Sequence, residues 1–389
     1  MRVPLPPSKV RAIRRRLLDH YDRGCRDLPW RGETDPYRIW VSEVILQQTR
    51  VGTAIPFYRR WLERFPTLEA LAASDPEDVR AAWSGLGYYR RARNLHRAAR
   101  IVRDQMGGRL PTEADALKGL PGVGPYTAGA VASIAFGRRE PAVDGNARRV
   151  LARLFDLEDP GGAELARLAG ALVPPDRPGD FNQALMELGA TVCRPRRPLC
   201  EACPVEDICL ARSRGTVAER PRAAPARAVP EEVVGTAIVM SRRGRVLLAR
   251  RPDKGLLGGM WEFPGAIADP REPPGTAAQR AMRALLGRPA LLDGADGDAL
   301  TVVPHAFSHR RHIYHAFTFR AAGETLVRPT LGPAPAALRG IPAWTAAEWV
   351  PLRAVVERAL PAAQRTIAAA LDQLRSGRDP SSTGSSSVR

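Results

Sequence analysis

Long apolar runs are missing from this sequence of 389 residues. A transmembrane helix needs about 20 predominantly apolar residues in a row, and no stretch of the chain approaches that length. The N-terminal residues also lack the basic and apolar pattern of a secretion signal. We therefore expect a cytoplasmic protein that has no membrane partner.

Cysteine is scarce, and its placement argues against a disulfide scaffold. Cys25 stands apart and is expected to be a small buried hydrophobic residue. The other four form the pattern C-x6-C-x2-C-x5-C in a Pro-rich segment, which indicates a metal site. Tetrahedral zinc and an iron–sulfur cluster both fit four thiolates, and only one short C-x2-C pair is present. The candidate ligands are Cys193, Cys200, Cys203 and Cys209.

Lysine is nearly absent, so arginine supplies almost all of the positive charge. Lys9, Lys118 and Lys254 are the three lysines among 59 basic residues, and the formal net charge is +18. A surplus of this size favours a polyanionic partner and salt-sensitive binding. We therefore expect the chain to bind nucleic acid. Three arginines, which are Arg194, Arg196 and Arg197, lie between the first two cysteines of the metal site and are expected to face phosphate.

The pattern of the chain predicts two structured domains. Residues 1–211 contain amphipathic segments with helical spacing and Pro or Asp at their starts, which indicates an all-helical domain. Residues 212–232 are rich in Arg, Ala and Pro and are typical of a linker. Residues 233–375 begin with two β-strand patterns and end with a helix near 361–374, which predicts an α+β domain. Residues 376–389 are expected to be disordered.

A glycine-rich turn at residues 120–124, Leu-Pro-Gly-Val-Gly, precedes an apolar helix predicted over 125–136. Gly122 and Gly124 allow a ligand to approach the backbone closely, and the start of the helix presents free N–H groups. The turn therefore predicts a phosphate-binding site. The helix is rich in small residues, so we expect a neighbouring helix to pack closely against it.

Two carboxylates are candidates for chemistry. Asp144, between Val143 and Gly145, is either the N-cap of the next helix or a reagent. Glu43 lies among apolar residues in the predicted helix YRIWVSEVILQQT. Burial there would raise its pKa into the range of a general acid, whereas a place on the solvent face would leave it without a catalytic role.

A loop with the sequence Trp-Ser-Gly-Leu-Gly-Tyr-Tyr, residues 83–89, is followed by a strongly basic helix. Aromatic side chains beside arginines suit a surface that stacks on bases. Tyr88 and Tyr89 are equally consistent with a place in the core.

The motifs together resemble the MutY-type adenine DNA glycosylases of the helix-hairpin-helix superfamily. The resemblance rests on WVSEVILQQTRV, GLGYYRRARNL, LPGVGPYTAGAVASIAFG, VDGNARRV, MELGA and the cysteine spacing, in this order, and covers residues 11–374. It implies two helical lobes that bind DNA, a [4Fe–4S] cluster and a C-terminal domain similar to the MutT/Nudix fold. The implied partner is double-stranded DNA with an A:8-oxoguanine or A:G mispair, bound by a monomer in the bacterial nucleoid.

The resemblance also assigns roles to individual residues. Glu43 is expected to protonate adenine N7 and then activate water, while Asp144 stabilises or traps the sugar cation beside Tyr126. Arg31 and Glu187 match positions near the base pocket, and the lesion-reading loop matches Phe307, Ser308 and His309. Further contacts with DNA are expected from Gln48, Thr49, Leu86, Tyr88, Gly122, Gly124 and Asn146.

The type of reaction follows from one position. Superfamily members that also cut the strand carry a lysine at the second residue after the last glycine of the turn, and this chain has Tyr126 there. Lys118 precedes the turn and is expected to point elsewhere. We therefore expect a monofunctional glycosylase that leaves an abasic site.

Other functions would require other residues in the sequence. A Nudix hydrolase needs a Glu-rich helix for Mg²⁺, but residues 265–287 contain only Asp269 and Glu272 as acids. Four histidines at positions 305, 309, 312 and 315 would suggest a metal, but strand alternation is expected to split them between faces. A non-catalytic iron–sulfur DNA-binding protein and a glycosylase for thymine or uracil remain as alternatives.

Overall fold

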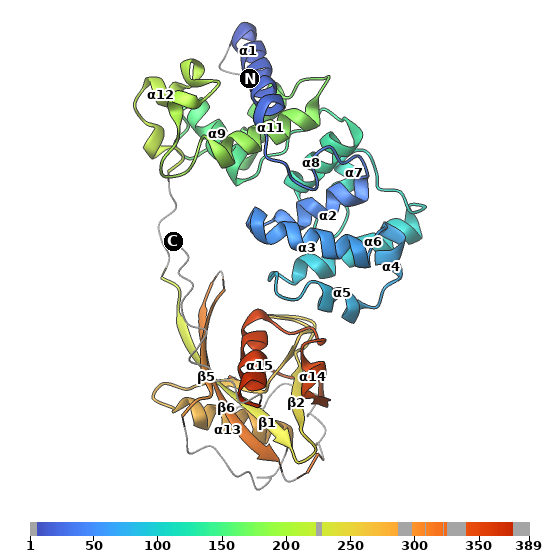
Figure 1. Ribbon diagram of the computed structural model, residues 1–389. Coiled ribbons are helices and arrows are strands. Elements are labelled where there is room, and N and C mark those ends of the chain that lie inside the picture. The colour runs from blue at the N-terminus through green and yellow to red at the C-terminus, as the bar shows by residue number, and fades with distance from the viewer. Residues whose placement is uncertain are drawn as a thin grey trace. The chain divides into compact units, whose positions relative to one another are not determined.

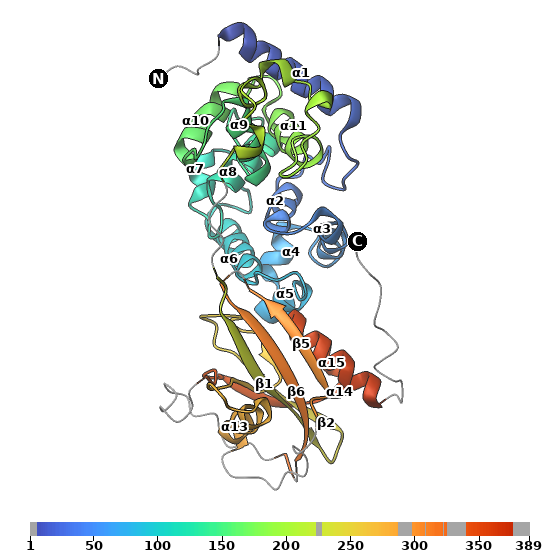
Figure 2. The same ribbon diagram turned by 90° about the vertical axis from the view of Figure 1, so that its left-hand side faces the viewer.

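The computed structural model describes residues 6–222, 228–286, 298–307, 309–321, 323–324 and 340–375 (Figures 1 and 2). The chain divides into two compact units. The helical unit contains Met1–Ser74 and Arg93–Ala226, and the sheet unit contains Asp75–Ala92 and Arg227–Arg389. Within the described ranges, no helix is both long and apolar enough to cross a membrane.

The helical unit is built from α-helices joined by short connections. Its core combines α1, α9, α10 and α11 with the cysteine segment, through side chains such as Leu17, Leu151, Phe181 and Ile208. The helices are α1 (Pro7–Gly24), α2 (Pro36–Leu46), α3 (Val51–Arg64), α4 (Leu68–Ala73), most of α6 (Arg90–Gln105), α7 (Ala114–Lys118), α8 (Pro125–Phe136), α9 (Gly145–Leu154), α10 (Gly162–Leu172), α11 (Pro178–Thr191) and α12 (Leu210–Ser213).

Small residues of α8 allow other parts of the chain to approach it closely, as predicted. A Cβ atom on Gly129 would lie 2.0 Å from the carbonyl oxygen of Pro141, in the connection to α9. Gly179 of α11 meets the backbone of α8 in the same way, with a Cβ position 2.8 Å from the Ser133 oxygen. The close approach places α11 beside α8, and both helices contribute to the candidate site.

The described residues of the sheet unit form one seven-stranded sheet in the order β3-β2-β1-β6-β5, with β4 paired to β1 and β7 to β2. The pair β1–β6 is parallel, and the other pairs in this sheet are antiparallel. The elements are α5 (Pro76–Ala82), β1 (Glu231–Ser241), β2 (Arg245–Arg250), β3 (Trp261–Glu262), β4 (Gly265–Ile267), α13 (Pro274–Leu286), β5 (Thr301–Ala306), β6 (Arg311–Ala321), β7 (Ala346–Pro351), α14 (Leu352–Val355) and α15 (Ala362–Arg375).

Side chains of β1 alternate between two cores, one for each face of the sheet. Ile238 packs with Ile367 and its neighbours on α15. Ala237 and Val239 pack with residues of α13, among them Met282. The predicted architecture of an all-helical part followed by an α+β part is confirmed.

Residues 75–92 belong to the sheet unit although they lie early in the sequence. The indole N–H of Trp261 donates to the Glu77 carboxylate at 2.8 Å. Ser84 donates to the carbonyl oxygen of Leu360 at 2.5 Å and accepts from Arg365 Nε at 2.8 Å. The segment that contains Leu86 and Tyr88 is therefore fixed by residues of α15 and the strands.

The predicted linker is partly structured at its start. The carboxylate of Asp156, which follows α9, forms ion pairs with Arg214 and Arg220 at 2.9 Å and accepts a hydrogen bond from Thr216. Residues 212–222 therefore pack against the helical unit. The end of the chain that was predicted to be disordered, residues 376–389, lies outside the described residues.

Candidate active site

Glu43 lies on α2 and is buried, with 5% of its surface exposed, so the solvent-face interpretation is wrong. Tyr126 of α8 donates its hydroxyl proton to Glu43 Oε2 at 2.5 Å. Burial raises the pKa of Glu43 to about 7, helped by the charge of Asp144 and opposed by the Tyr126 hydrogen bond and by Arg31. A carboxyl group with this pKa is able both to give and to take a proton near neutral pH.

Tyr126 is partly buried at the site and keeps its proton. Desolvation raises the pKa of Tyr126 well above its usual value, and the charges of Glu43 and Asp144 raise it further. The Tyr126 hydroxyl also lies 3.4 Å from the sulfur of Met186 on α11. Tyr126 therefore acts as a fixed donor that orients the carboxyl group of Glu43.

Asp144 is the N-cap of α9, which settles one of the two predicted roles and leaves the other open. Its carboxylate accepts from the backbone N–H of Ala147 at 2.7 Å and from Asn146 Nδ2 at 2.9 Å. Burial raises the pKa of Asp144, and these hydrogen bonds oppose that effect because they favour the charged form. Asp144 also lies close enough to Glu43 to raise the pKa of that residue, so the N-cap of α9 is part of the candidate site.

Arg31 and Glu187 form an ion pair at 2.8 Å, which brings the two predicted pocket residues together. Arg31 also donates to Gln183 at 2.5 Å, and Arg26 binds Glu187 at 2.7 Å. Burial would raise the pKa of Glu187, but the bonds from Arg26 and Arg31 outweigh burial and lower the pKa. Glu187 is therefore held as a carboxylate.

The sequence analysis did not identify Arg26, Gln183 or Met186. Gln183 precedes Glu187 by four positions on α11, so the two side chains share a helix face. This spacing was the available signal for Gln183. Arg26 gave no local signal, because its partner is 161 positions away in the chain.

The glycine-rich turn has the predicted geometry. Gly122 has a φ of 81°, and a Cβ atom there would lie 2.7 Å from Asn94. Gly124 is the N-cap of α8, and no side chain of the described residues caps this helix start. A Cβ on Gly124 would meet nothing within 4 Å. The first N–H groups of α8 are therefore suited to an anion.

Two predicted DNA-contact residues have unusual backbone conformations. Gln48 has a φ of 57° and Tyr88 a φ of 48°, a region that residues other than glycine rarely adopt. Tyr88 is exposed at 47%, whereas Tyr89 and Leu86 are buried at 9% each. The core interpretation therefore holds for Tyr89 and is wrong for Tyr88. Thr49 follows Gln48 and is partly exposed.

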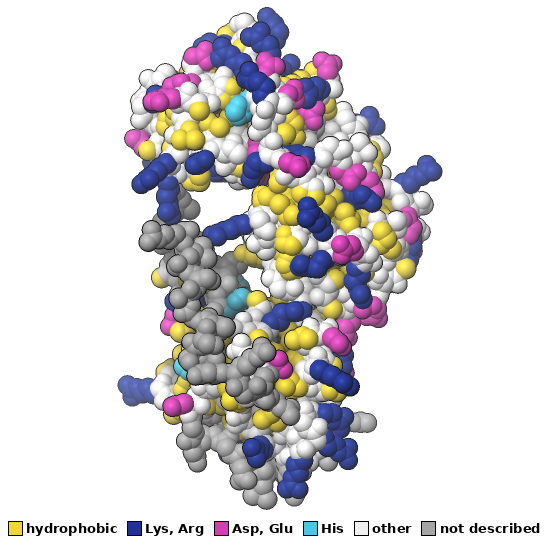
Figure 3. All heavy atoms as spheres, in the orientation of Figure 1, with side chains coloured by type: hydrophobic (Ala, Val, Ile, Leu, Met, Phe, Trp, Pro, Cys, Tyr) yellow, Lys and Arg dark blue, Asp and Glu magenta, His cyan; other side chains and the backbone are white. Residues whose placement is uncertain are grey.

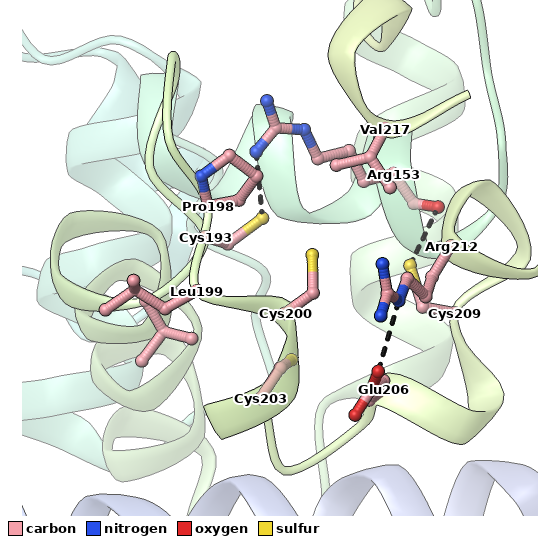
Figure 4. Close-up of a pocket in the computed structure, with 11 residues that line it drawn as sticks. Arg153, Cys193, Pro198, Leu199, Cys200, Cys203, Glu206, Cys209, Arg212 and Val217 are labelled. Carbon is pink, nitrogen blue, oxygen red and sulfur yellow. Dashed lines mark hydrogen bonds and ion pairs between the residues drawn. The ribbon is translucent and has the colours of Figure 1, made fainter. Parts of the chain in front are cut away.

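The four cysteines are free thiols that line one cavity, together with Arg153 and Leu199 (Figure 4). Arg153 Nη1 lies 3.4 Å from Cys193 Sγ and donates to the Arg194 carbonyl oxygen at 2.7 Å. No three His, Cys, Asp or Glu side chains of the described ranges converge closely enough for a single ion. Four thiols around one cavity fit a multi-iron cluster better than one tetrahedral zinc ion.

The loop between the first two cysteines is at the surface. Arg196 and Arg197 are exposed, and Arg194 is exposed with its Nε donating to the Thr191 carbonyl oxygen at 2.7 Å. The loop is tied to α9, since Arg149 Nε donates to the Cys193 carbonyl oxygen at 2.8 Å. The three arginines are therefore available to an anionic partner.

The predicted lesion-reading loop is the tip of the β5–β6 hairpin. Phe307 N–H donates to the Arg310 carbonyl oxygen at 2.8 Å, which closes the tip, and His309 is exposed. Ser308 lies outside the described residues. The histidines are split between the two faces of the hairpin, as strand alternation predicted: His305 and His312 are cross-strand partners on one face, and His315 is paired with Val302 on the other.

The acids of the Nudix-like region are held by other side chains. Glu272 forms an ion pair with Arg280 at 2.8 Å, which lowers the pKa of Glu272. Glu262 pairs with Arg251 at 3.0 Å and accepts from the Trp344 indole at 2.8 Å. Both carboxylates have protein partners in this part of the structure.

Comparison with known proteins agrees with both units. Residues 41–175 match the model of the HhH-GPD superfamily base excision DNA repair proteins, and residues 235–370 match the NUDIX domain. A structure of a thermostable thymine-DNA glycosylase is similar, with a TM-score of 0.50 and 32% identity, and it covers 53% of this chain and 98% of its own.

Curated relatives are more similar in sequence. The adenine DNA glycosylase of Homo sapiens is 40% identical over 379 residues, which covers 82% of this chain and 69% of the human protein. The adenine DNA glycosylase of Mycolicibacterium smegmatis is 44% identical over 212 residues, 52% of this chain and 72% of that protein. The chain therefore belongs to the adenine DNA glycosylases, with a helix-hairpin-helix glycosylase unit followed by a Nudix-like domain.

Proposed function

We propose that this adenine DNA glycosylase of base excision repair acts on adenine opposite 8-oxoguanine or guanine, hydrolyses its N-glycosidic bond and leaves an abasic site. The observation that carries the proposal is the buried Glu43 carboxyl group, with a pKa of about 7, hydrogen-bonded by Tyr126 and close to Asp144. A proton donor beside a second carboxylate is what cleavage of a glycosidic bond requires.

The reaction assigns a separate task to each carboxyl group. Once adenine has left the base stack, Glu43 gives its proton to adenine N7 while the bond between N9 and the sugar breaks. Asp144 stabilises the positive charge that develops on the sugar. Glu43, now a carboxylate, takes a proton from water as the hydroxyl group adds to the sugar carbon. The products are free adenine and an abasic site.

The presence of tyrosine at position 126 favours an enzyme that releases the base without cutting the DNA strand. Strand cleavage by a Schiff base needs an amine at the site, and Tyr126 occupies the position where the bifunctional relatives carry lysine. Lys118, the nearest lysine in the sequence, is half exposed and forms an ion pair with Asp115 at 2.5 Å. We propose a monofunctional enzyme.

The partner that we propose is double-stranded DNA, bound by a monomer in the bacterial cytoplasm. A formal net charge of +18 and the Lys and Arg side chains across the face seen in Figure 3 support a polyanionic partner. The uncapped start of α8, the exposed Tyr88 and the arginines of the cysteine loop are suited to phosphate and base contacts.

The cofactor that we propose is a [4Fe–4S] cluster held by Cys193, Cys200, Cys203 and Cys209. The four cysteines line one cavity, and Arg149 and Arg153 of α9 donate to the carbonyl oxygens of Cys193 and Arg194. The cluster would supply a rigid centre around which the arginine loop is ordered. Analysis of purified protein should find about four iron and four acid-labile sulfide atoms per chain. One zinc ion per chain in iron-free protein would refute the assignment.

Replacement of Glu43 by Gln should abolish the proton donor and keep the shape of the side chain. We expect adenine release in a single turnover to fall by at least about 100-fold, the usual contribution of a general acid, while the duplex still binds. For the parent, kcat/KM should decrease as the pH rises above about 7, because the reactive form is the protonated one.

Tyr126→Phe provides a matched control for the pH profile. The Tyr126 hydrogen bond lowers the pKa of Glu43, so its loss should move the basic limb to higher pH. Glu43→Gln should have no such limb. Fast adenine release by Glu43→Gln would remove Glu43 from the mechanism.

Asp144→Asn should separate the two roles of this residue. Asparagine is a good N-cap, so the melting temperature should change little, but the charge that stabilises the sugar cation is lost. We expect adenine release to fall by about 100-fold or more. Asp144→Ala should show the same rate loss and should also lose about 1 kcal/mol of stability with the cap. Normal rates in a folded Asp144→Asn variant would leave the cap as its only role.

Simultaneous replacement of Phe307, Ser308 and His309 by alanine should reduce the preference for A:8-oxoguanine over A:G. One good contact with a base edge provides about 1 to 3 kcal/mol, so the preference should fall about tenfold or more. Base release from defined duplexes at limiting enzyme measures the ratio, with T:G and U:G duplexes as tests of the thymine and uracil alternatives. An unchanged ratio would place lesion recognition in the helical unit and residues 75–92.

A further inference from the structure

A network of hydrogen-bonded polar side chains from β1 and β6 lies next to the tip of the β5–β6 hairpin. His312 of β6 is 6% exposed and is the register partner of Glu232 on the parallel strand β1. His312 Nε2 lies 2.9 Å from Glu232 Oε2, and His312 Nδ1 lies 3.1 Å from the Tyr314 hydroxyl. The same Glu232 oxygen accepts from Arg310 Nη1 at 3.1 Å.

The partners define the tautomer of His312. An ionised carboxylate only accepts hydrogen bonds, so the proton between His312 and Glu232 belongs to Nε2. Burial lowers the pKa of His312 more than Glu232 raises it, so the ring is neutral at neutral pH and Nδ1 is an acceptor. Burial raises the pKa of Tyr314, whose hydroxyl therefore keeps its proton and donates to Nδ1.

Phe307 makes edge-to-face contacts with two histidine rings, His312 of this network and His305 of β5. Its ring centroid lies 4.9 Å from that of His312 and 4.6 Å from that of His305. His305 and His312 are cross-strand partners, so Phe307 is held against a pair of rings on one face of the hairpin. The tip is thus fixed at both ends, through Phe307 on the His312 ring and through Arg310 on Glu232.

We propose that Glu232, His312 and Tyr314 are positioning residues for lesion recognition: they hold Phe307 and Arg310 in the arrangement that meets the base opposite adenine. The inference rests on the proposed function, because it assigns this hairpin to the 8-oxoguanine partner. The three residues act through Phe307 and Arg310 and need not touch the DNA.

The test is the ratio of adenine release from A:8-oxoguanine and A:G duplexes in single variants. His312→Ala removes both the ring contact and the hydrogen bonds, and we expect the ratio to fall about tenfold. Tyr314→Phe removes only the hydroxyl group, and a net hydrogen bond corresponds to about a threefold change. His315→Ala is the matched control, because His315 lies on the opposite face of the same strand, and its ratio should equal that of the parent.

A spectroscopic measurement distinguishes positioning from general packing. Nitrogen-15 NMR of the histidine-labelled full chain should show His312 as a neutral Nε2–H tautomer with a slowly exchanging proton, assigned by its loss in the His312 variant. Tyr314→Phe should alter the His312 Nδ1 signal and the substrate ratio together. A neutral Nδ1–H tautomer, or unchanged ratios in both folded variants, would overturn the proposal.

The outcomes also separate this inference from the proposed function. If the parent shows no preference for A:8-oxoguanine, the substrate assignment fails. If the triple alanine variant at residues 307–309 loses the preference while His312→Ala and Tyr314→Phe keep it, the hairpin reads the lesion and the positioning role of the network is refuted. Tyr314→Phe keeps the ring and its packing, so it decides the question if His312→Ala does not fold.

Discussion

The hydrogen bond from Tyr126 to Glu43 is the contact around which the candidate site is organised, since it fixes a carboxyl group inside an apolar helix interface. Burial among apolar side chains raises the pKa of Glu43 to about 7. The hydrogen bond from the Tyr126 hydroxyl limits that rise, because it favours the charged carboxylate. The close packing of α8 provides this environment. Gly129 and Gly179 allow α8 to meet backbone atoms that a larger residue would push away.

Asp144 is the N-cap that starts α9, and it is also the second carboxylate of the candidate site. The N–H groups of the helix start favour its charged form against the cost of burial. Further along α9, Arg149 and Arg153 hold the carbonyl oxygens of Cys193 and Arg194. One short helix therefore fixes both the Asp144 carboxylate and the start of the cysteine segment.

In the sheet unit, the tip of the β5–β6 hairpin is held by contacts of Phe307 with His312 and of Arg310 with Glu232. A neutral buried histidine is able to accept from a tyrosine and donate to a carboxylate at once, which a protonated ring cannot do. Residues 75–92, with the exposed Tyr88, are fixed in the same unit by Glu77 and Ser84. Among the described residues of this unit, Glu272 is paired with Arg280 of α13.

The sequence by itself determined the local features: the helix start at Asp144, the glycine-rich turn, the strands and the cysteine spacing, because capping, φ preferences and periodicity act over a few residues. Only the tertiary structure decided the environment of Glu43, the ion pairs of Glu187, the facing pair His305 and His312, and the grouping of residues 75–92. Those contacts join positions far apart, such as 83 residues between Glu43 and Tyr126 and 156 between Arg31 and Glu187. The burial that shifts a pKa is a property of the packed chain, and no local pattern encodes it.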